Sequence, residues 1–162
     1  MCFKHSVRAA GLMGRARAAI EVPGSVEAAE ALWYDLQRWP TFVDGFAHVV
    51  RAEGWPDTGG TLVWDSTPAG RGRVVEHVTA HVSGEGQTAE VEDPRVAGTQ
   101  TVAFTPLEDG VGVTLSLDYK LKQGGPLRAL ADLFFIGRAM RDSLRRTLVR
   151  FARELEAAAE LR

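Results

Sequence analysis

The sequence predicts an α+β domain in which a curved antiparallel sheet of about seven strands wraps around one long C-terminal helix. Three observations lead to this prediction. Short alternating segments with brief turns fill the chain between Phe46 and Lys122, and parallel strands would need longer crossovers. One strand with two short helices precedes them, and an uninterrupted helical pattern follows. Because such a sheet cannot cover its own concave face, the long helix is expected to close it.

The first elements lie before Phe46. The segment "RARAAIEV", which starts at Arg15, alternates polar and apolar residues as a half-buried strand does. After the breaker "PGS", Ser25 is placed to cap a helix in "VEAAEALWYDL". Pro40 either ends that helical pattern or occupies the first turn of a second short helix. The Trp39-Pro40 pair is therefore expected between two short helices, or just after one.

About six further strands are expected, because turn signals divide the middle of the chain. The turn-forming stretches are "DTGG", "PAGRG", "SGEG", "PRVAG" and "EDG". The last strand has the clearest alternation, with polar residues on one face and apolar residues on the other. The apolar face consists of Val113, Leu115, Leu117, Tyr119 and Leu121. One face of the sheet is therefore predicted to be buried and the other to face solvent.

The final helix is predicted from Pro126, which takes the favoured first helical position, to about Leu161. At 1.5 Å per residue it is about 50 Å long, enough to cross a small domain. Its apolar residues form one stripe at helical spacing: Leu130, Leu133, Gly137, Leu144, Leu148, Phe151 and Leu155.

Length and composition limit the domain organisation and the location. The 162 residues suit a single domain, predicted at 13–162, with residues 1–12 as an N-terminal tail. The single Cys2 excludes an internal disulfide and a cysteine-based zinc site, and a cytoplasmic location is expected. No run approaches the ~20 apolar residues of a membrane span, so no integral membrane association is expected.

Charge and motifs narrow the classes of partner. With 19 Lys and Arg against 21 Asp and Glu, the net charge of -2 predicts no nucleic-acid binding. The chain carries no phosphate-binding loop, dinucleotide fingerprint or Gly-x-Ser-x-Gly motif, and no cofactor is expected. A small hydrophobic molecule remains the expected partner, and the sequence leaves the oligomeric state open.

A pattern near the start of the chain points to a known superfamily. It is formed by Val22, Ser25, Glu27, Leu32, Asp35, Trp39, Pro40, Phe42 and Phe46. With "GGPLRALADLFFIGRAM" opening the last helix, this pattern resembles the START-like (SRPBCC) helix-grip superfamily, in particular its polyketide cyclase/dehydrase and lipid-transport branch. The resemblance covers about 15–156 and implies a cavity for lipids, polyketides, hormones or quinones. Members of the superfamily share no single reaction, so the fold does not specify the chemistry.

Aromatic residues are the first candidates for the cavity wall. Trp39, Phe42 and Phe46 either line the cavity mouth or anchor the two short helices to the sheet. Trp64 shares a strand face with Leu62 and is expected to line the cavity. Where aromatic cyclases often carry a tyrosine, this chain has Phe46, and the missing hydroxyl argues for binding rather than catalysis.

The strand "RVVEHVTAHV" contains the acid-base candidates, and either of its two faces could point into the domain. The apolar residues favour an inward valine face, which would turn Glu76 inward and leave His77 and His81 in solvent. The resemblance favours the reverse, because aromatic cyclases place inward groups at the matching positions. A bulge near Gly70 or Gly72 could decide between them, and we expect His77 to contact the cavity. The two histidines lack a third ligand, and no metal site is expected.

Two residues of the last helix are also singled out. Arg141 projects into the apolar stripe, so it either extends to the rim or contacts a polar group of a ligand. Gly137 indicates space for a close neighbour or a ligand, because glycine destabilises a helix by about 1 kcal/mol relative to alanine.

Binding of a small hydrophobic ligand between the sheet and the last helix is therefore the predicted function. The first alternative is a polyketide cyclase/dehydrase for aldol-type cyclisation or dehydration, with His77 as general base and Arg141 stabilising an enolate. The second is a START-type interaction protein that uses the arginine-rich face of the last helix. The predicted ligand-binding residues are Trp39, Phe42, Phe46, Trp64, Glu76, His77, Phe104, Tyr119, Leu133, Gly137, Met140 and Arg141.

Overall fold

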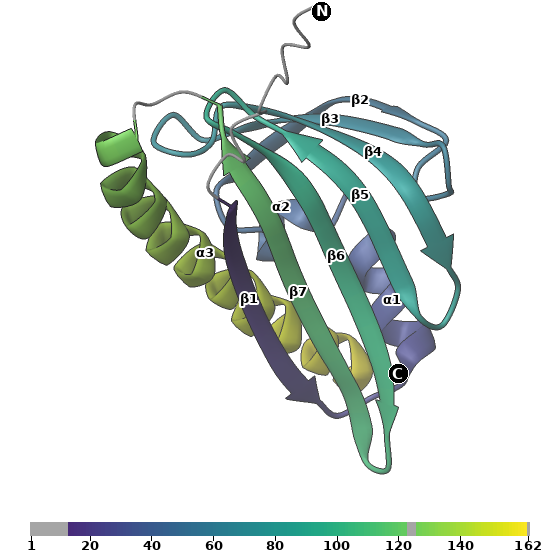
Figure 1. Ribbon diagram of the computed structural model, residues 1–162. Helices are drawn as coiled ribbons and strands as arrows, with labels where there is room; N and C mark the ends of the chain where they lie inside the picture. The colour runs from purple at the N-terminus through teal and green to yellow at the C-terminus, as the bar shows by residue number, and fades with distance from the viewer. Residues whose placement is uncertain (1–12, 123–125, 162) are drawn as a thin grey trace, which may run out of the picture.

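The computed structural model describes residues 13–122 and 126–161. The predicted tail at 1–12 lies outside the described residues. The elements follow the predicted order of one strand, two short helices, six strands and one long helix (Figure 1).

Seven antiparallel strands form one open, curved sheet. Its spatial order is β1-β7-β6-β5-β4-β3-β2, so that consecutive strands pair from β2 to β7 and β1 adds to β7 at the edge. The strands are β1 (Met13–Val22), β2 (Phe46–Glu53), β3 (Thr61–Ser66), β4 (Arg73–Val82), β5 (Gly86–Glu92), β6 (Val96–Leu107) and β7 (Gly110–Leu121). The brief turns seen in the sequence are what allow this meander.

The helices α1 (Val26–Tyr34) and α2 (Trp39–Phe42) join β1 to β2. Ser25 caps α1 as predicted, because its hydroxyl accepts a 3.1 Å hydrogen bond from the backbone N–H of Ala28. Pro40 lies in the first turn of α2, where its missing N–H costs no helical hydrogen bond.

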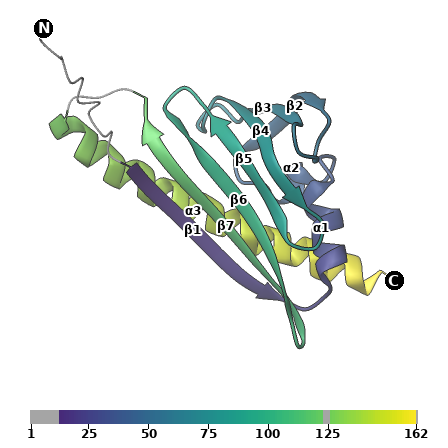
Figure 2. The same cartoon turned by 45° about the vertical axis from the view of Figure 1, so that its right-hand side comes forward.

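The long helix α3 (Pro126–Glu160) lies on the same side of the sheet as α1 and α2 (Figure 2). The C-terminal half of α3 packs its apolar stripe against the concave face, where Leu148, Phe151 and Leu155 are buried. The first turns of α3 extend past the edge of the sheet (Figure 1). Leu130, which the helical projection placed in the buried stripe, is therefore exposed, as are Phe134 and Phe135.

Tyr119 of β7 contacts both β1 and α3. Its ring is buried, and its hydroxyl lies 3.4 Å from the carbonyl oxygen of Leu133 in α3. A Cβ at Gly14 would lie 2.3 Å from Tyr119 Cζ, and one at Gly137 would lie 2.9 Å from the Tyr119 hydroxyl. Both glycines thus make room for this ring, and the close neighbour expected at Gly137 is a tyrosine of the protein itself.

Candidate functional site

A small chamber of about 50 Å³ lies between the concave face of the sheet, α2 and α3. Eight apolar and six polar residues form its walls. The apolar lining residues are Trp33, Trp39, Val43, Trp64, Leu115, Leu117, Met140 and Leu144, and the polar ones are Asp44, Arg71, Glu76, Gln100, Ser143 and Thr147.

A groove of about 420 Å³ leads from this chamber to the surface. It runs between the β3–β4 turn and the middle of α3, and Arg95 lies on its wall. The chamber and the groove share five lining residues: Asp44, Trp64, Arg71, Met140 and Ser143. We call the chamber and groove together the recess; it has an apolar inner end and a polar mouth.

Glu76 is the least exposed of the polar residues that line the recess, with 2 % of its surface exposed. Trp64 Nε1 donates a 2.8 Å hydrogen bond to Glu76 Oε1. Burial raises the pKa of the Glu76 carboxyl, while the Trp64 hydrogen bond and the positive charge of Arg71 act in the opposite direction. The net shift is upward, toward the neutral carboxyl, which is the form that can donate a hydrogen bond or a proton.

Arg71 comes from the β3–β4 turn and lines both parts of the recess. Its Nε donates a 2.7 Å hydrogen bond to Asp93 Oδ2, which is itself buried. The other Asp93 oxygen accepts the backbone N–H groups of Arg95 and Val96. Arg71 Nη2 is buried and has no hydrogen-bond partner among the described residues.

Asp44 joins the turn after α2 to α3 at the mouth of the recess. Its carboxylate accepts hydrogen bonds from Ser143 at 2.9 Å and from Arg146 Nε and Nη2 at 3.0 and 2.9 Å. Arg150 Nη1 lies 3.2 Å away, and the Asp44 backbone N–H donates to the Thr147 hydroxyl. Hydrogen bonding from Arg146 is the main reason that the pKa of Asp44 is lowered. Two arginines of the predicted interaction face thus belong to the mouth of the recess.

The predicted aromatic wall separates into lining and core residues. Trp39 is buried, donates a 2.7 Å hydrogen bond from Nε1 to the Trp33 carbonyl and also lines the chamber. Phe42 packs instead against Trp33 and Phe151 in the core. Phe46 lies behind the chamber wall, its ring against those of Trp39 and Trp64.

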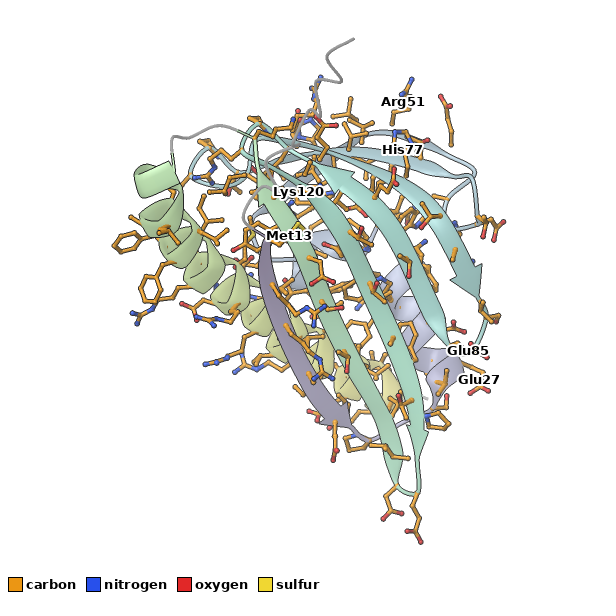
Figure 3. The ribbon with its side chains drawn as sticks, in the orientation of Figure 1. Met13, Glu27, Arg51, His77, Glu85 and Lys120 are labelled. Atoms are coloured by element: carbon orange, nitrogen blue, oxygen red, sulfur yellow. The ribbon has the colours of Figure 1, made fainter. Side chains whose placement is uncertain are left out.

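The valine face of β4, not the histidine face, is turned inward at the start of the strand. Val74, Glu76 and Val78 are buried, whereas His77 is exposed on the opposite face, 3.1 Å from the Thr61 hydroxyl. Figure 3 shows His77 and Lys120 on the face of the sheet turned away from the helices. The prediction that His77 contacts the cavity is therefore wrong, and so is its role as general base there.

A register shift between Val78 and Ala80 reverses the phase of β4. His81, rather than His77, then turns inward: its ring lies 4.9 Å from that of Tyr34, and its Nδ1 lies 3.3 Å from Asp57 Oδ1. A β-bulge has this effect because one extra residue changes which side chains share a face. The bulge comes later in the strand than Gly70 and Gly72, where the sequence suggested one.

Four of the predicted site residues meet at the recess: Trp39, Trp64, Glu76 and Met140. Phe104 packs against Tyr34 in the core, and Leu133 and Tyr119 pack together beside Gly137. Arg141 is exposed on α3 and does not line the recess, so it does not occupy the predicted ligand-binding position. Its exposure agrees with the other expectation, that its long side chain leaves the apolar stripe.

The sequence reading missed the polar residues at the mouth. Arg71 and Arg95 lie in segments that the sequence marked only as turns, and Asp44 follows the aromatic stretch. Leu115 and Leu117 could have been found, because the alternation of the last strand already placed both on the buried face. Within 13–122 and 126–161, no group of three or more His, Cys, Asp or Glu residues could hold a metal ion, and no helix could span a membrane.

The family model described as polyketide cyclase / dehydrase and lipid transport matches residues 13–156. The chain belongs to this family. The family covers the whole sheet, the short helices and most of α3, and the fold is the helix grip that the sequence predicted. No curated protein sequence matches this member of the family.

Solved structures with the same fold include proteins of different activity. The di-domain aromatase/cyclase StfQ from the steffimycin biosynthetic pathway is 18% identical with a TM-score of 0.73, over 92% of this chain and 52% of StfQ. This polyketide cyclase/dehydrase family member thus spans about half the length of StfQ. Norcoclaurine synthase of Thalictrum is 11% identical with a TM-score of 0.68, over 92% of this chain and 98% of the synthase. A Thermus thermophilus protein is 21% identical with a TM-score of 0.68, over 89% and 98% of the two chains. At these identities the likeness shows the fold alone.

Proposed function

We propose that the protein binds a small hydrophobic molecule in the recess between the sheet and α3. The observation that carries the proposal is the continuity of the recess: Trp64 and Met140 line both its inner chamber and its outer groove. Apolar walls with a few polar groups are typical of small-molecule sites. Burying about 200 Å² of apolar ligand surface would contribute about 5 kcal/mol to binding, at about 25 cal/mol per Å².

The dimensions of the recess restrict the way in which a ligand can bind. The chamber, at about 50 Å³, admits only the end of an alkyl chain or the edge of a ring, whereas the groove has room for the rest. An elongated or flat molecule that enters between the β3–β4 turn and α3 fits this shape. Lipids, polyketides and quinones all contain such a part.

Filling the recess with a protein side chain tests the proposal. Binding of the neutral fluorescent probe N-phenyl-1-naphthylamine is measured for the wild type, Met140→Trp and Ala139→Trp, with Val149→Trp as the control. Met140 lines both chamber and groove, Ala139 is an exposed residue of the groove, and Val149 is exposed elsewhere on α3. We expect at least a roughly tenfold loss of affinity in the first two variants, equal to about 1.4 kcal/mol, and none in the control.

Two results would contradict the proposal. One is a wild-type protein that neither binds the probe nor retains a hydrophobic adduct in native mass spectrometry after mild purification. The other is equal probe affinity in all four proteins. Ala139→Trp keeps the experiment decisive if Met140→Trp does not fold, because residue 139 is exposed and its substitution leaves the core intact.

A second candidate is catalysis of a polyketide cyclisation or dehydration, with Glu76 in place of His77. The observation that favours it is the buried Glu76 carboxyl, whose pKa is raised mainly by desolvation. A protonated Glu76 carboxyl in the recess could protonate a hydroxyl as it leaves as water, and the resulting carboxylate could take the proton from the adjacent carbon as the double bond forms, which restores the acid. Turnover of a linear polyketide should then be lost in Glu76→Gln while probe binding persists. Wild-type turnover should fall as the pH rises through the Glu76 pKa, and equal turnover by the two proteins would exclude this role.

A further inference from the structure

We propose that the recess selects amphiphiles with a single anionic headgroup, whose carboxylate or phosphate binds the arginines at its mouth while the apolar part enters the chamber. This inference rests on the proposed binding function and adds the chemical class of the ligand. It depends on two independent observations, namely the charge of the mouth and a buried guanidinium nitrogen without a partner.

The mouth carries an excess of positive charge. Four arginines line the groove, from the β3–β4 turn, the β5–β6 turn and α3: Arg71, Arg95, Arg146 and Arg150. Two carboxylates face them, because Asp44 pairs with Arg146 and Arg150, and Asp93 pairs with Arg71. Arg95 has no ion-pair partner among the residues that the structure describes. Converging guanidinium groups of this kind recognise carboxylate and phosphate oxygens, often with two parallel hydrogen bonds.

Arg71 supplies the second observation. Asp93 binds only its Nε, and Nη2 is left buried without an acceptor within the described part of the chain. A buried donor without a partner destabilises a protein, so such groups usually meet an acceptor in the functional state. Arg71 lines both chamber and groove, and an oxyanion bound where the two meet would be such an acceptor.

The carboxyl group inside the recess does not oppose an anion. Glu76 lines the chamber, and burial raises the pKa of its carboxyl, which shifts this group toward its neutral form. The same chamber is lined by apolar side chains, among them Leu115, Leu117 and Leu144. The polarity thus changes from positive at the mouth to apolar at the inner end, which matches an anionic amphiphile that enters tail first.

Competition between ligands with the same alkyl chain tests the headgroup. Dodecanoate and dodecyltrimethylammonium, below their micellar concentrations, and dodecan-1-ol, below its solubility limit, are titrated against bound N-phenyl-1-naphthylamine at low ionic strength. Dodecanoate should bind about tenfold more tightly than dodecan-1-ol, because hydrogen bonds between charged groups are stronger than those to a neutral hydroxyl. The ammonium ligand should bind most weakly. Dodecyl phosphate in a parallel titration shows which of the two oxyanions is preferred.

Substitutions then test whether the preference for an anionic headgroup depends on the arginines at the mouth of the recess. Arg95→Gln removes an exposed charge of a turn, so folding is preserved, and Arg17→Gln on the outer face of β1 is the matched control. We expect Arg95→Gln to weaken dodecanoate binding several-fold and to leave dodecan-1-ol unchanged, with no effect of Arg17→Gln. Arg71→Met should abolish the preference if the variant folds.

The outcomes separate this inference from the proposed function. If the neutral probe does not bind, the proposed function fails and the headgroup inference fails with it. If the probe binds but dodecanoate and dodecan-1-ol compete equally, only the headgroup inference is overturned. Tighter binding of the ammonium ligand, or equal effects of Arg95→Gln and Arg17→Gln, would overturn it as well.

Discussion

The indole N–H of Trp64 donates a 2.8 Å hydrogen bond to the carboxyl group of Glu76 inside the sheet-and-helix grip. Trp64 lies opposite Val74 in the β3–β4 ladder, two residues from Glu76, so the bond joins diagonal neighbours on one face. It gives a buried acid one of its hydrogen bonds and fixes the orientation of a tryptophan that lines the whole recess.

Replacing Glu76 by Gln should change how stability depends on pH. The folded-state pKa of Glu76 is raised above its ordinary 4.5, so the folded protein binds more protons than the unfolded chain above that pH. Wild-type stability should therefore fall as the pH rises from about 4.5 through the folded-state pKa. In Glu76→Gln this contribution is absent, because the amide oxygen accepts from Trp64 at every pH. Urea unfolding between pH 4.5 and 8 measures the free energy of unfolding of both proteins. The same pH dependence in both would contradict a raised pKa of Glu76.

Replacing Asp44 by Asn should loosen the attachment of α3. The carboxylate holds Ser143, Arg146 and Arg150, but both arginines are about half exposed, so solvent screening limits the effect. We expect a loss of about 1–2 kcal/mol at pH 7, within the range of hydrogen bonds to charged groups. Because the folded-state pKa of Asp44 is below its ordinary 3.8, this contribution is present above pH 3.8 and is lost as the pH falls through the folded-state pKa.

Urea unfolding of Asp44→Asn at pH 7 and at pH 3 measures both parts of this prediction. Glu21→Gln, at an exposed residue of β1, is the charge-matched control and should unfold like the wild type. An Asp44→Asn protein as stable as this control at pH 7 would show that the ion pairs do not stabilise α3.

Gly14→Ala should destabilise the protein through the Tyr119 ring. The added Cβ would lie 2.3, 2.6 and 2.8 Å from three atoms of that ring, which β1, β7 and α3 enclose. Overpacking of this kind costs about 1–3 kcal/mol. The matched control is Gly112→Ala in β7, whose Cβ would lie 3.7 Å from its nearest neighbours, at an ordinary van der Waals distance. Thermal unfolding compares the two variants, and equal melting temperatures would show that the ring can move aside.

His77→Ala should leave both stability and ligand binding nearly unchanged. The His77 ring lies on the outer face of the sheet, away from the recess, and exposed substitutions change stability by about 0.5 kcal/mol or less. The same probe titration and thermal unfolding used above measure this. A loss of probe affinity comparable to that of Met140→Trp would mean that the phase of β4 differs from the one described.

Local patterns in the sequence predicted most of the fold. The strand at 73–82, the cap at Ser25 and the helix start at Pro126 were read from alternation, capping chemistry and the restrictions of proline. These features act within a few residues of one another, so a single segment contains the information. The order of elements then led to the helix grip, because an open sheet of this kind needs a covering helix.

The candidate site was less accessible from the sequence, as three residues illustrate. The sequence leads us to expect His77 inside. The register shift in β4 lies after His77, between Val78 and Ala80, so the histidine that turns inward is His81. Phe104 is a predicted ligand-binding residue, but its ring packs against that of Tyr34 in the core and does not line the recess. Arg71 belongs to a turn, where the sequence offers no periodicity that would relate it to a cavity.

Patterns along the chain predict the elements, their order and most of the apolar faces that are buried. Which of the buried residues line an opening, and which charges gather at its mouth, depends on how the elements pack together. The physical reason is that a recess remains where side chains from separate elements fail to fill the space between them. Trp64, Glu76, Arg71 and Met140 come from β3, β4, a turn and α3, and no spacing along one segment relates them.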